Sequence, residues 1–160
     1  MRLLIAAVGK LKPGPERELF AHYLSRAEAA GRKLKLSPVN AIEVAESRAA
    51  TAKGRVSAET ELLLAKIPET YKRIALDPAG RSFSSEAFAE QLARYRDLGA
   101  DGVAFLIGGP DGLDRQALGK FAQAISLGPM TLPHGLVRVV LAEQIYRAAT
   151  ILAGHPYHRA

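Results

Sequence analysis

The sequence predicts an α/β fold in which a parallel sheet is flanked by helices. Three short apolar runs show little alternation of polar and apolar residues, which is typical of strands buried on both faces of such a sheet. Segments with helical periodicity lie between these runs, and this alternation favours parallel strands joined by crossover helices. The runs are RLLIAAVG at 2–9, YKRIAL at 71–76 and GVAFLIGG at 102–109.

The first helix is expected after Pro15, because apolar residues recur at helical spacing over 19–27 and proline is tolerated at the first helical position. A similar pattern over 62–67 predicts a second helix. This helix should end near Pro68, since proline disfavours helical geometry at the residue before it.

Two further helices are expected to be capped by Ser84 and Asp114, and Gly99 supplies the stop for the earlier of them. The alternating run KLKLSPV at 33–39 predicts a strand nearer an edge of the sheet. Residues 40–54 are rich in small and charged side chains, so we expect a loop or the frayed start of a helix there.

Length and composition fit one domain over residues 1–160. Of its 160 residues, 48% are hydrophobic and 24% are charged, which is typical of a globular protein with one core. No apolar run approaches the roughly 20 residues of a membrane helix, so we expect no membrane segment. The absence of cysteine excludes disulfides, thiolate metal sites and a cysteine nucleophile, and it favours a cytoplasmic location.

The formal net charge of +6 favours a polyanionic partner such as RNA or DNA. Each Lys or Arg that neutralises a phosphate releases condensed counterions, which strengthens binding. A positive surface that is merely solvated explains the charge equally well. Charge alone therefore leaves nucleic-acid binding open.

Ligands of open α/β sheets usually bind beyond the carboxyl ends of the strands. The segments in question are the opening loop, LDPAG at 76–80 and IGGPDGLD at 107–114. The glycines of IGGPDG allow a close approach to a ligand, but the pattern matches neither G-x-G-x-x-G nor the P-loop. A nucleotide-binding turn and a tight structural turn both remain open.

The last helix, expected over 136–153, follows an irregular segment rich in glycine and proline at 126–135. At about 100° per residue, Arg138 falls on the same side as the apolar Leu141 and Ile145. A buried guanidinium is costly unless it is paired or hydrogen-bonded. Arg138 is therefore expected at an interface, in a site or in a buried salt bridge.

Two of the four histidines, His155 and His158, lie close together near the last residue. The intervening Pro156 disfavours helical spacing, and neither a carboxylate nor a cysteine is nearby in the sequence, so we expect no metal site. A catalytic base, an RNA contact and a disordered tail are the alternatives.

Four motifs together resemble the RlmH family of small SPOUT-class methyltransferases, which act on a pseudouridine in bacterial large-subunit ribosomal RNA. They follow one another at compatible spacing from 76 to 159, and the opening AVGKLK at 7–12 also fits. The motifs are LDPAGRSFSSE at 76–86, FLIGGPDGL at 105–113, LGPMTLPHGLVRVVLAEQIYRA at 127–148 and HPYHR at 155–159.

The resemblance implies a parallel sheet whose C-terminal segment is tucked through a loop as a trefoil knot. It implies a homodimer, S-adenosyl-L-methionine as methyl donor, and transfer to N3 of a pseudouridine in 23S ribosomal RNA of the assembled ribosome. Two alternatives remain: a non-catalytic basic RNA-binding module and a small enzyme that binds a nucleotide phosphate through IGGPDG.

The resemblance also implies roles for individual residues. Tyr157 would stack or hydrogen-bond, His158 would accept a proton, and Arg159 would bind phosphate or stabilise the deprotonated base, in the pocket of the other subunit. Gly128-Pro129 departs from the small polar or basic residues that relatives often carry there. The residues expected to line the cofactor pocket are Leu76, Gly108, Leu127, Gly128, Pro129, Met130, Thr131 and Leu132.

Overall fold

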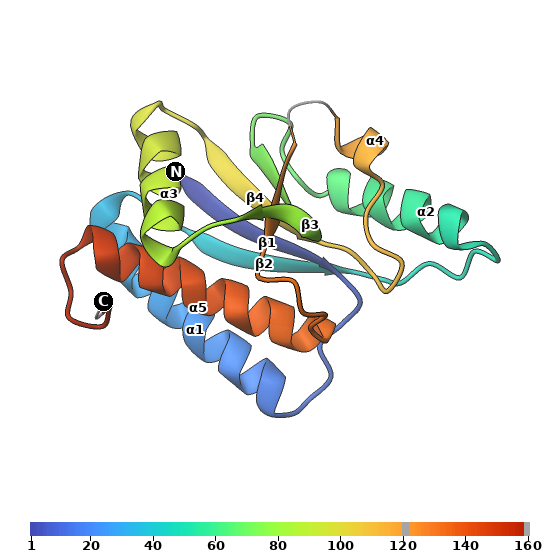
Figure 1. Cartoon of the computed structure of the whole chain (residues 1–160), viewed down its shortest axis with the longest axis horizontal. Helices are drawn as coiled ribbons and strands as arrows, with labels where there is room; N and C mark the ends of the chain where they lie inside the picture. The colour runs from blue at the N-terminus through green and yellow to red at the C-terminus, as the bar shows by residue number, and fades with distance from the viewer. Residues whose placement is uncertain (120–121, 159–160) are drawn as a thin grey trace.

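A computed structural model describes residues 1–119 and 122–158. Five strands form one sheet in the order β2-β1-β4-β3-β5, and all neighbouring strands are parallel. Helices α1, α3 and α5 cover one face, and α2 and α4 cover the other (Figure 1). The elements are β1 (Arg2–Val8), α1 (Pro15–Gly31), the 3-10 turn η1 (Arg32–Leu34), β2 (Val39–Val44), α2 (Ala52–Leu64), β3 (Lys72–Ser82), α3 (Ser85–Asp97), β4 (Gly102–Ile107), α4 (Arg115–Leu118), β5 (Gln123–Ser126) and α5 (His134–Leu152).

The two central strands explain why the sequence shows no alternation there. Successive residues of β1 pack into different layers, with Ile5 in the core under α1, α3 and α5, and Leu4 in the core under α2 and α4. In β4, Phe105 packs in the same core as Ile5, and Leu106 packs in the same core as Leu4. Because both layers are apolar, every position is apolar, and the prediction of these strands is confirmed.

Several predicted helix signals are confirmed. Pro15 opens α1. The hydroxyl of Ser84 accepts a hydrogen bond from the amide of Ala87, and the carboxylate of Asp114 accepts from the amides of Gln116 and Ala117. Each cap satisfies amides that a first helical turn leaves without partners.

The strand predicted at 33–39 is wrong. The loop or frayed helix start predicted at 40–54 is wrong for 40–44, which belong to β2, whereas 45–51 form a loop and α2 begins at Ala52. Residues 32–34 form η1, Lys35 takes a left-handed φ of 56°, and the strand begins only at Val39. The alternating pattern of 33–39 arose because Leu36 is buried in the core, although it lies between η1 and β2 and not in a strand. The real strand β2 was hidden because it lies at the edge of the sheet, where polar side chains are tolerated.

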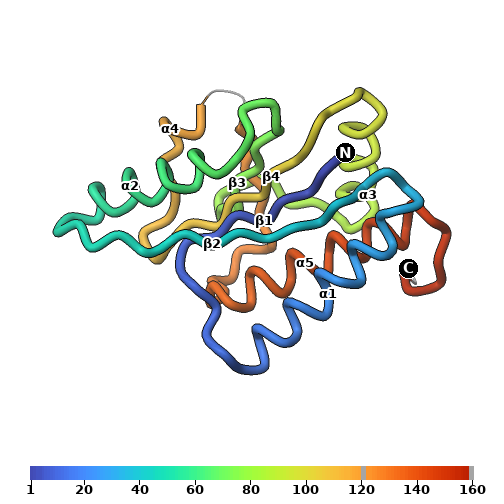
Figure 2. Tube along the Cα trace, turned by 180° about the vertical axis from the view of Figure 1, so that it is seen from behind, coloured from blue at the N-terminus to red at the C-terminus, as the bar shows by residue number. Residues whose placement is uncertain are grey.

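The part of the fold that positions the site is the edge formed by β3 and β5. Leu76 and Arg81 of β3 both pair with Ile125, so residues 77–80 form a bulge that leaves the sheet. On the face of the sheet that α1, α3 and α5 cover, helices α1 and α5 lie side by side along much of their length (Figures 1 and 2). None of the helices that the structure describes is long and apolar enough to cross a membrane.

Candidate functional site

A cavity of 230 Å³ lies at the carboxyl ends of β3, β4 and β5. Leu76 comes from the end of the first pairing segment of β3, Gly108 follows β4, and the loop between β5 and α5 supplies most of one wall. Seven of the eight residues predicted for the cofactor pocket line this cavity; Pro129 does not. The sequence motifs, spread over more than 50 positions, therefore converge on one place.

Apolar side chains and backbone amides that donate no hydrogen bond to another described residue make this cavity suitable for an adenosine. Leu76, Leu127 and Leu132 contribute apolar wall. Among the hydrogen bonds between described residues, none is donated by the amides of 130–132, so these amides remain available to a ligand. An apolar pocket with a few free polar groups is the usual form of a cofactor site, and the residues present fit S-adenosyl-L-methionine in this respect.

The glycine turn after β4 is tightly closed. The amide of Gly112 donates to the carbonyl of Gly109 at 3.0 Å. A Cβ added to Gly108 would lie 2.5 Å from the carbonyl oxygen of Gly112, so no larger residue fits without moving the turn. The tight structural turn expected as one alternative is present, and its glycines also line the cavity.

Asp77 at the cavity was not predicted as a site residue. Its carboxylate is paired with Arg115 at 2.6 Å and accepts the amide of Ala79. Partial burial favours a higher pKa, but the bonds from Arg115 and Ala79 outweigh it and hold the pKa of Asp77 below its usual value. Asp77 therefore carries a negative charge beside the cavity at neutral pH.

A second hollow of 510 Å³ adjoins the cavity and shares Gly109, Pro110 and His134 with it. The loop after β1 lines this hollow with Lys10 and Lys12. The opening motif AVGKLK is thus brought beside the predicted cofactor pocket, as the strand-end argument expected for the opening loop.

Tyr157 and His158 line no part of the cavity in their own chain. The segment after α5 folds back, so that the ring of Tyr157 packs 4.6 Å from that of Tyr146 and its hydroxyl donates to Glu143 at 3.1 Å. Glu143 lies roughly 14 Å further along α5 than His134, at the usual helical rise. The structure therefore separates these two predicted catalytic residues from the other site residues of the same subunit.

The environment of Tyr157 keeps it protonated. Its pKa is raised well above the ordinary tyrosine value, first by burial and then by hydrogen bonds with Tyr23 and Glu143. Raising the pKa of a phenol disfavours the phenolate. Tyr157 can thus donate a hydrogen bond or stack, but it does not act as an anionic base at neutral pH.

His158 is held by a carboxylate of α3. Its Nε2 lies 2.7 Å from Oε1 of Glu86, and its Nδ1 is buried with no partner among the described residues. Arg159, the third predicted catalytic residue, lies outside the described residues. No group of three or more His, Asp or Glu side chains within 1–119 and 122–158 is arranged to hold a metal ion.

The fold is a parallel α/β sheet, and its strand ends and the loop before its last helix enclose a cavity where ligands of such sheets usually bind. The chain belongs to the SPOUT methyltransferase family: the family model described as a predicted SPOUT methyltransferase matches residues 1–158. Methyltransferases of this family depend in general on S-adenosyl-L-methionine.

Three similar proteins carry the name ribosomal RNA large subunit methyltransferase H. One from Xanthobacter autotrophicus is 53% identical over 160 residues, and one from Rhodopseudomonas palustris is 52% identical; the match covers 100% of both chains in each case. One from Methylorubrum populi is 48% identical, covering 99% of this chain and 97% of the relative. The similarity thus includes every motif on which the predicted site depends.

Proposed function

We propose that this protein is an S-adenosyl-L-methionine-dependent methyltransferase acting on ribosomal RNA, with N3 of a pseudouridine in 23S ribosomal RNA of the assembled ribosome as its target. One observation carries the proposal: the motif residues Leu76, Gly108 and most of 127–132 line a single cavity at the strand ends. Membership of the SPOUT family and the names of the relatives support the reaction and the RNA substrate.

In this proposal the bound cofactor supplies an electrophilic methyl group. Leu76, Leu127 and Leu132 enclose the adenosine and exclude water, the amides of 130–132 bind the adenine edge, and Gly108 permits close approach. Holding the two reactants in line contributes much of the rate enhancement, since orientation alone can lower a barrier by about 7–11 kcal/mol. The nucleobase must be exposed, which favours a single-stranded loop or an extruded nucleotide.

We further propose that the active unit is a homodimer, with the C-terminal segment forming a trefoil knot. The support for the homodimer is that Tyr157 and His158 line no part of the cavity in their own chain. The knot rests on membership of the SPOUT family. A site completed by the tail of the partner subunit accounts for a motif that is otherwise far from the cofactor. In that site Arg159 binds RNA phosphate, and Tyr157 stacks or donates a hydrogen bond.

His158 can act as the proposed proton acceptor only through a ring nitrogen that carries no proton and can reach the substrate. A proton on Nε2 that is donated to Glu86 leaves Nδ1 as the unprotonated nitrogen of a neutral ring. Because Nδ1 is buried, the tail must leave Glu86 before this nitrogen can meet a substrate. Alignment of the substrate with loss of the proton to water is the alternative mechanism.

The decisive experiment incubates the protein with S-adenosyl-L-methionine and ribosomes that lack the modification, followed by mass spectrometry of the RNA. One added methyl on the expected pseudouridine is the predicted result. Calorimetry with the cofactor separates this function from a non-catalytic RNA-binding module, which would bind no cofactor. Competent ribosomes that gain no methyl group contradict the proposed activity.

A further inference from the structure

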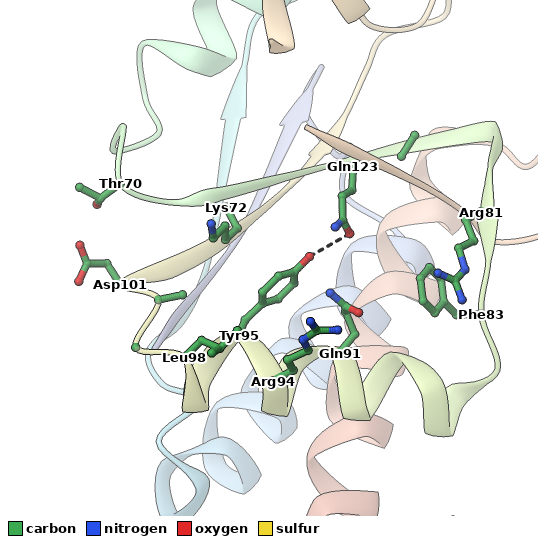
Figure 3. Close-up of a pocket in the computed structure, with 13 residues that line it drawn as sticks. Thr70, Lys72, Arg81, Phe83, Gln91, Arg94, Tyr95, Leu98, Asp101 and Gln123 are labelled. Atoms are coloured by element: carbon green, nitrogen blue, oxygen red, sulfur yellow. Dashed lines mark hydrogen bonds between the residues drawn. The ribbon is translucent and has the colours of Figure 1, made fainter. Parts of the chain in front are cut away.

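A groove of 770 Å³ lies on the α3 side of the β3–β5 edge of the sheet and shares no lining residue with the methyl-donor cavity. The start of β3, the start of β5 and the last turns of α3 form its walls (Figure 3). Among the described residues that line it, three are cationic, Lys72, Arg81 and Arg94, and one is a carboxylate, Asp101. The groove is therefore positively charged.

These three cations are not neutralised within the chain. All three are exposed, and none forms an ion pair with a carboxylate within 4.0 Å in the part of the chain that the structure describes. The guanidinium of Arg81 instead lies 4.7 Å from the ring centroid of Phe83. A concave surface lined by one sign of charge concentrates the field and attracts ions of opposite sign.

The cations are spread along the groove. Arg81 occupies the same register as Leu76, because both pair with Ile125, so it lies about four strand positions, or ~13 Å, further along the strand direction than Lys72. Figure 3 shows Lys72 and Arg81 on opposite sides of Tyr95, with Arg94 below it. One small anion cannot contact charges so far apart, whereas successive phosphates of a polynucleotide can.

Neutral hydrogen-bonding groups lie between the charges. The hydroxyl of Tyr95 donates to Oε1 of Gln123 at 2.9 Å, which leaves the amide NH₂ of Gln123 as a donor. Figure 3 shows Gln91 beside Arg94, on the same side of the groove. Amide and guanidinium donors next to each other are the usual partners of phosphate and sugar oxygens in nucleic-acid complexes.

The groove is connected to the methyl-donor cavity by an intermediate cleft of 370 Å³. Phe83 lines both the groove and this cleft, and Leu127 and Gly128 line both the cleft and the cavity. The groove, the cleft and the methyl-donor cavity are thus neighbours, so an RNA strand that extends beyond the groove can approach the cavity.

We propose that the Lys72–Arg81–Arg94 groove is a second RNA-binding site, which holds the sugar-phosphate backbone of the ribosomal RNA outside the site of methyl transfer. The identity of the polyanion as ribosomal RNA rests on the proposed function; the binding of an RNA backbone rests on the charge, spacing and continuity of the groove. The groove contributes to substrate affinity and takes no part in chemistry.

The test compares the wild type with the triple variant K72Q/R81Q/R94Q. Fluorescence anisotropy with a labelled single-stranded RNA is recorded over a series of salt concentrations, and co-sedimentation measures binding to assembled ribosomes. Loss of three phosphate contacts should weaken binding about 10-fold or more and make the slope of log affinity against log salt shallower by about 2. Cofactor affinity by calorimetry should not change, and any methylation should show a raised KM for ribosomes with kcat retained.

The matched control is K33Q/K53Q/K66Q, which removes the same charge from exposed lysines outside the groove. An equal loss of affinity in both triple variants, or no change in the salt slope, overturns the groove proposal. The two proposals fail separately. A wild type that methylates ribosomes while the groove variant binds RNA normally refutes only the groove, and a groove-dependent RNA affinity without methylation refutes only the enzymatic function.

Discussion

The buried Arg138 of α5 forms an ion pair with the partly exposed Glu43 of β2, with 2.7 Å between Nη1 and Oε1. Its Nη2 also donates to the carbonyl oxygens of Val8 and Gly9, at 2.6 and 2.8 Å. One guanidinium thereby ties the start of α5 to the ends of β1 and β2, beside the hollow that adjoins the cofactor cavity. Of the three environments expected for Arg138, the structure shows the buried salt bridge.

Arg138→Met should destabilise the fold. The substitution leaves two buried carbonyls without their donor and Glu43 without its partner, which predicts a loss of about 2–4 kcal/mol in the free energy of unfolding. Urea denaturation followed by circular dichroism measures it. Arg147→Met on the same helix is the control. The Arg147 side chain is 26% exposed against 3% for Arg138, and among the described residues its guanidinium donates to Glu143 and to no backbone carbonyl, so this substitution should cost about 1 kcal/mol or less. Equal midpoints for the two variants would contradict this account.

The position of Arg138 shows how much of its environment could be predicted from the sequence. An arginine on the apolar side of a helix predicts a buried partner, because an unpaired buried charge is too costly. The partner could not be named, since Glu43 lies in a segment that was predicted as a loop and is a strand at the edge of the sheet. Edge strands carry polar side chains, so the apolar pattern that revealed β1 and β4 is absent there. The four-residue strand β5 was too short to give any pattern.

The candidate site, too, could be predicted only in part from the sequence. The usual position of ligands beyond strand ends pointed to 76–80 and 107–114, which include Leu76 and Gly108 of the cavity. The loop 127–132 was assigned to the pocket by the resemblance to the RlmH family and not by the topology of the sheet. The contact of Tyr157 with Glu143 could not be predicted, since it depends on a tail that folds back on its own helix. Pairing of Asp77 with Arg115 was missed for a similar reason, because Arg115 follows a different strand.

Met130→Ala should weaken cofactor binding without destabilising the fold. Met130 lines the cavity, yet 79% of it is exposed, so little core packing is lost on truncation. Removing one side chain from an apolar wall predicts a rise of about 5–30-fold in the Kd for S-adenosyl-L-methionine by calorimetry. Leu62→Ala, which removes an exposed apolar side chain from α2, should leave this Kd unchanged. A Kd unaffected by Met130→Ala would place the cofactor elsewhere.

Substitutions of Tyr157 should separate stacking from hydrogen bonding. Tyr157→Phe keeps the packing on Tyr146 and loses only the hydrogen bonds of the hydroxyl with Glu143 and Tyr23, so methylation should fall less than about 10-fold. Tyr157→Ala loses the packing as well, and methylation should fall further. Because the pKa of Tyr157 is raised, the wild type and Tyr157→Phe should show the same pH dependence of kcat/KM between about pH 7 and 10. A change of kcat/KM at high pH that occurs in the wild type and not in Tyr157→Phe would show that the tyrosine ionises during the reaction.

Glu28 should make the fold sensitive to acid. Its carboxylate accepts the amide of Val39 at 2.7 Å, the hydroxyl of Ser37 at 2.9 Å and Nε of Arg32 at 3.1 Å, which joins the end of α1 to the start of β2. Burial favours a higher pKa, but the bonds from Val39, Arg32 and Ser37 outweigh it, so the pKa of Glu28 is lowered on folding. A lowered pKa stabilises the folded state above the unfolded value of about 4.3, and this contribution is lost as the pH falls through the folded value.

Glu28→Gln should therefore cost about 1–2 kcal/mol in the free energy of unfolding at pH 7, because a neutral amide accepts these bonds less strongly. The difference should shrink as the pH falls from 7 toward 3, because the amide loses its disadvantage once the wild-type carboxyl is protonated below its lowered pKa. Urea unfolding at both pH values measures it, with Glu90→Gln, an exposed residue of α3, as the control that should show no difference at either pH. If the difference in the free energy of unfolding between the wild type and Glu28→Gln stays constant down to pH 3, the negative charge of Glu28 contributes nothing to stability. Only the shape of the side chain would then matter at the α1–β2 junction.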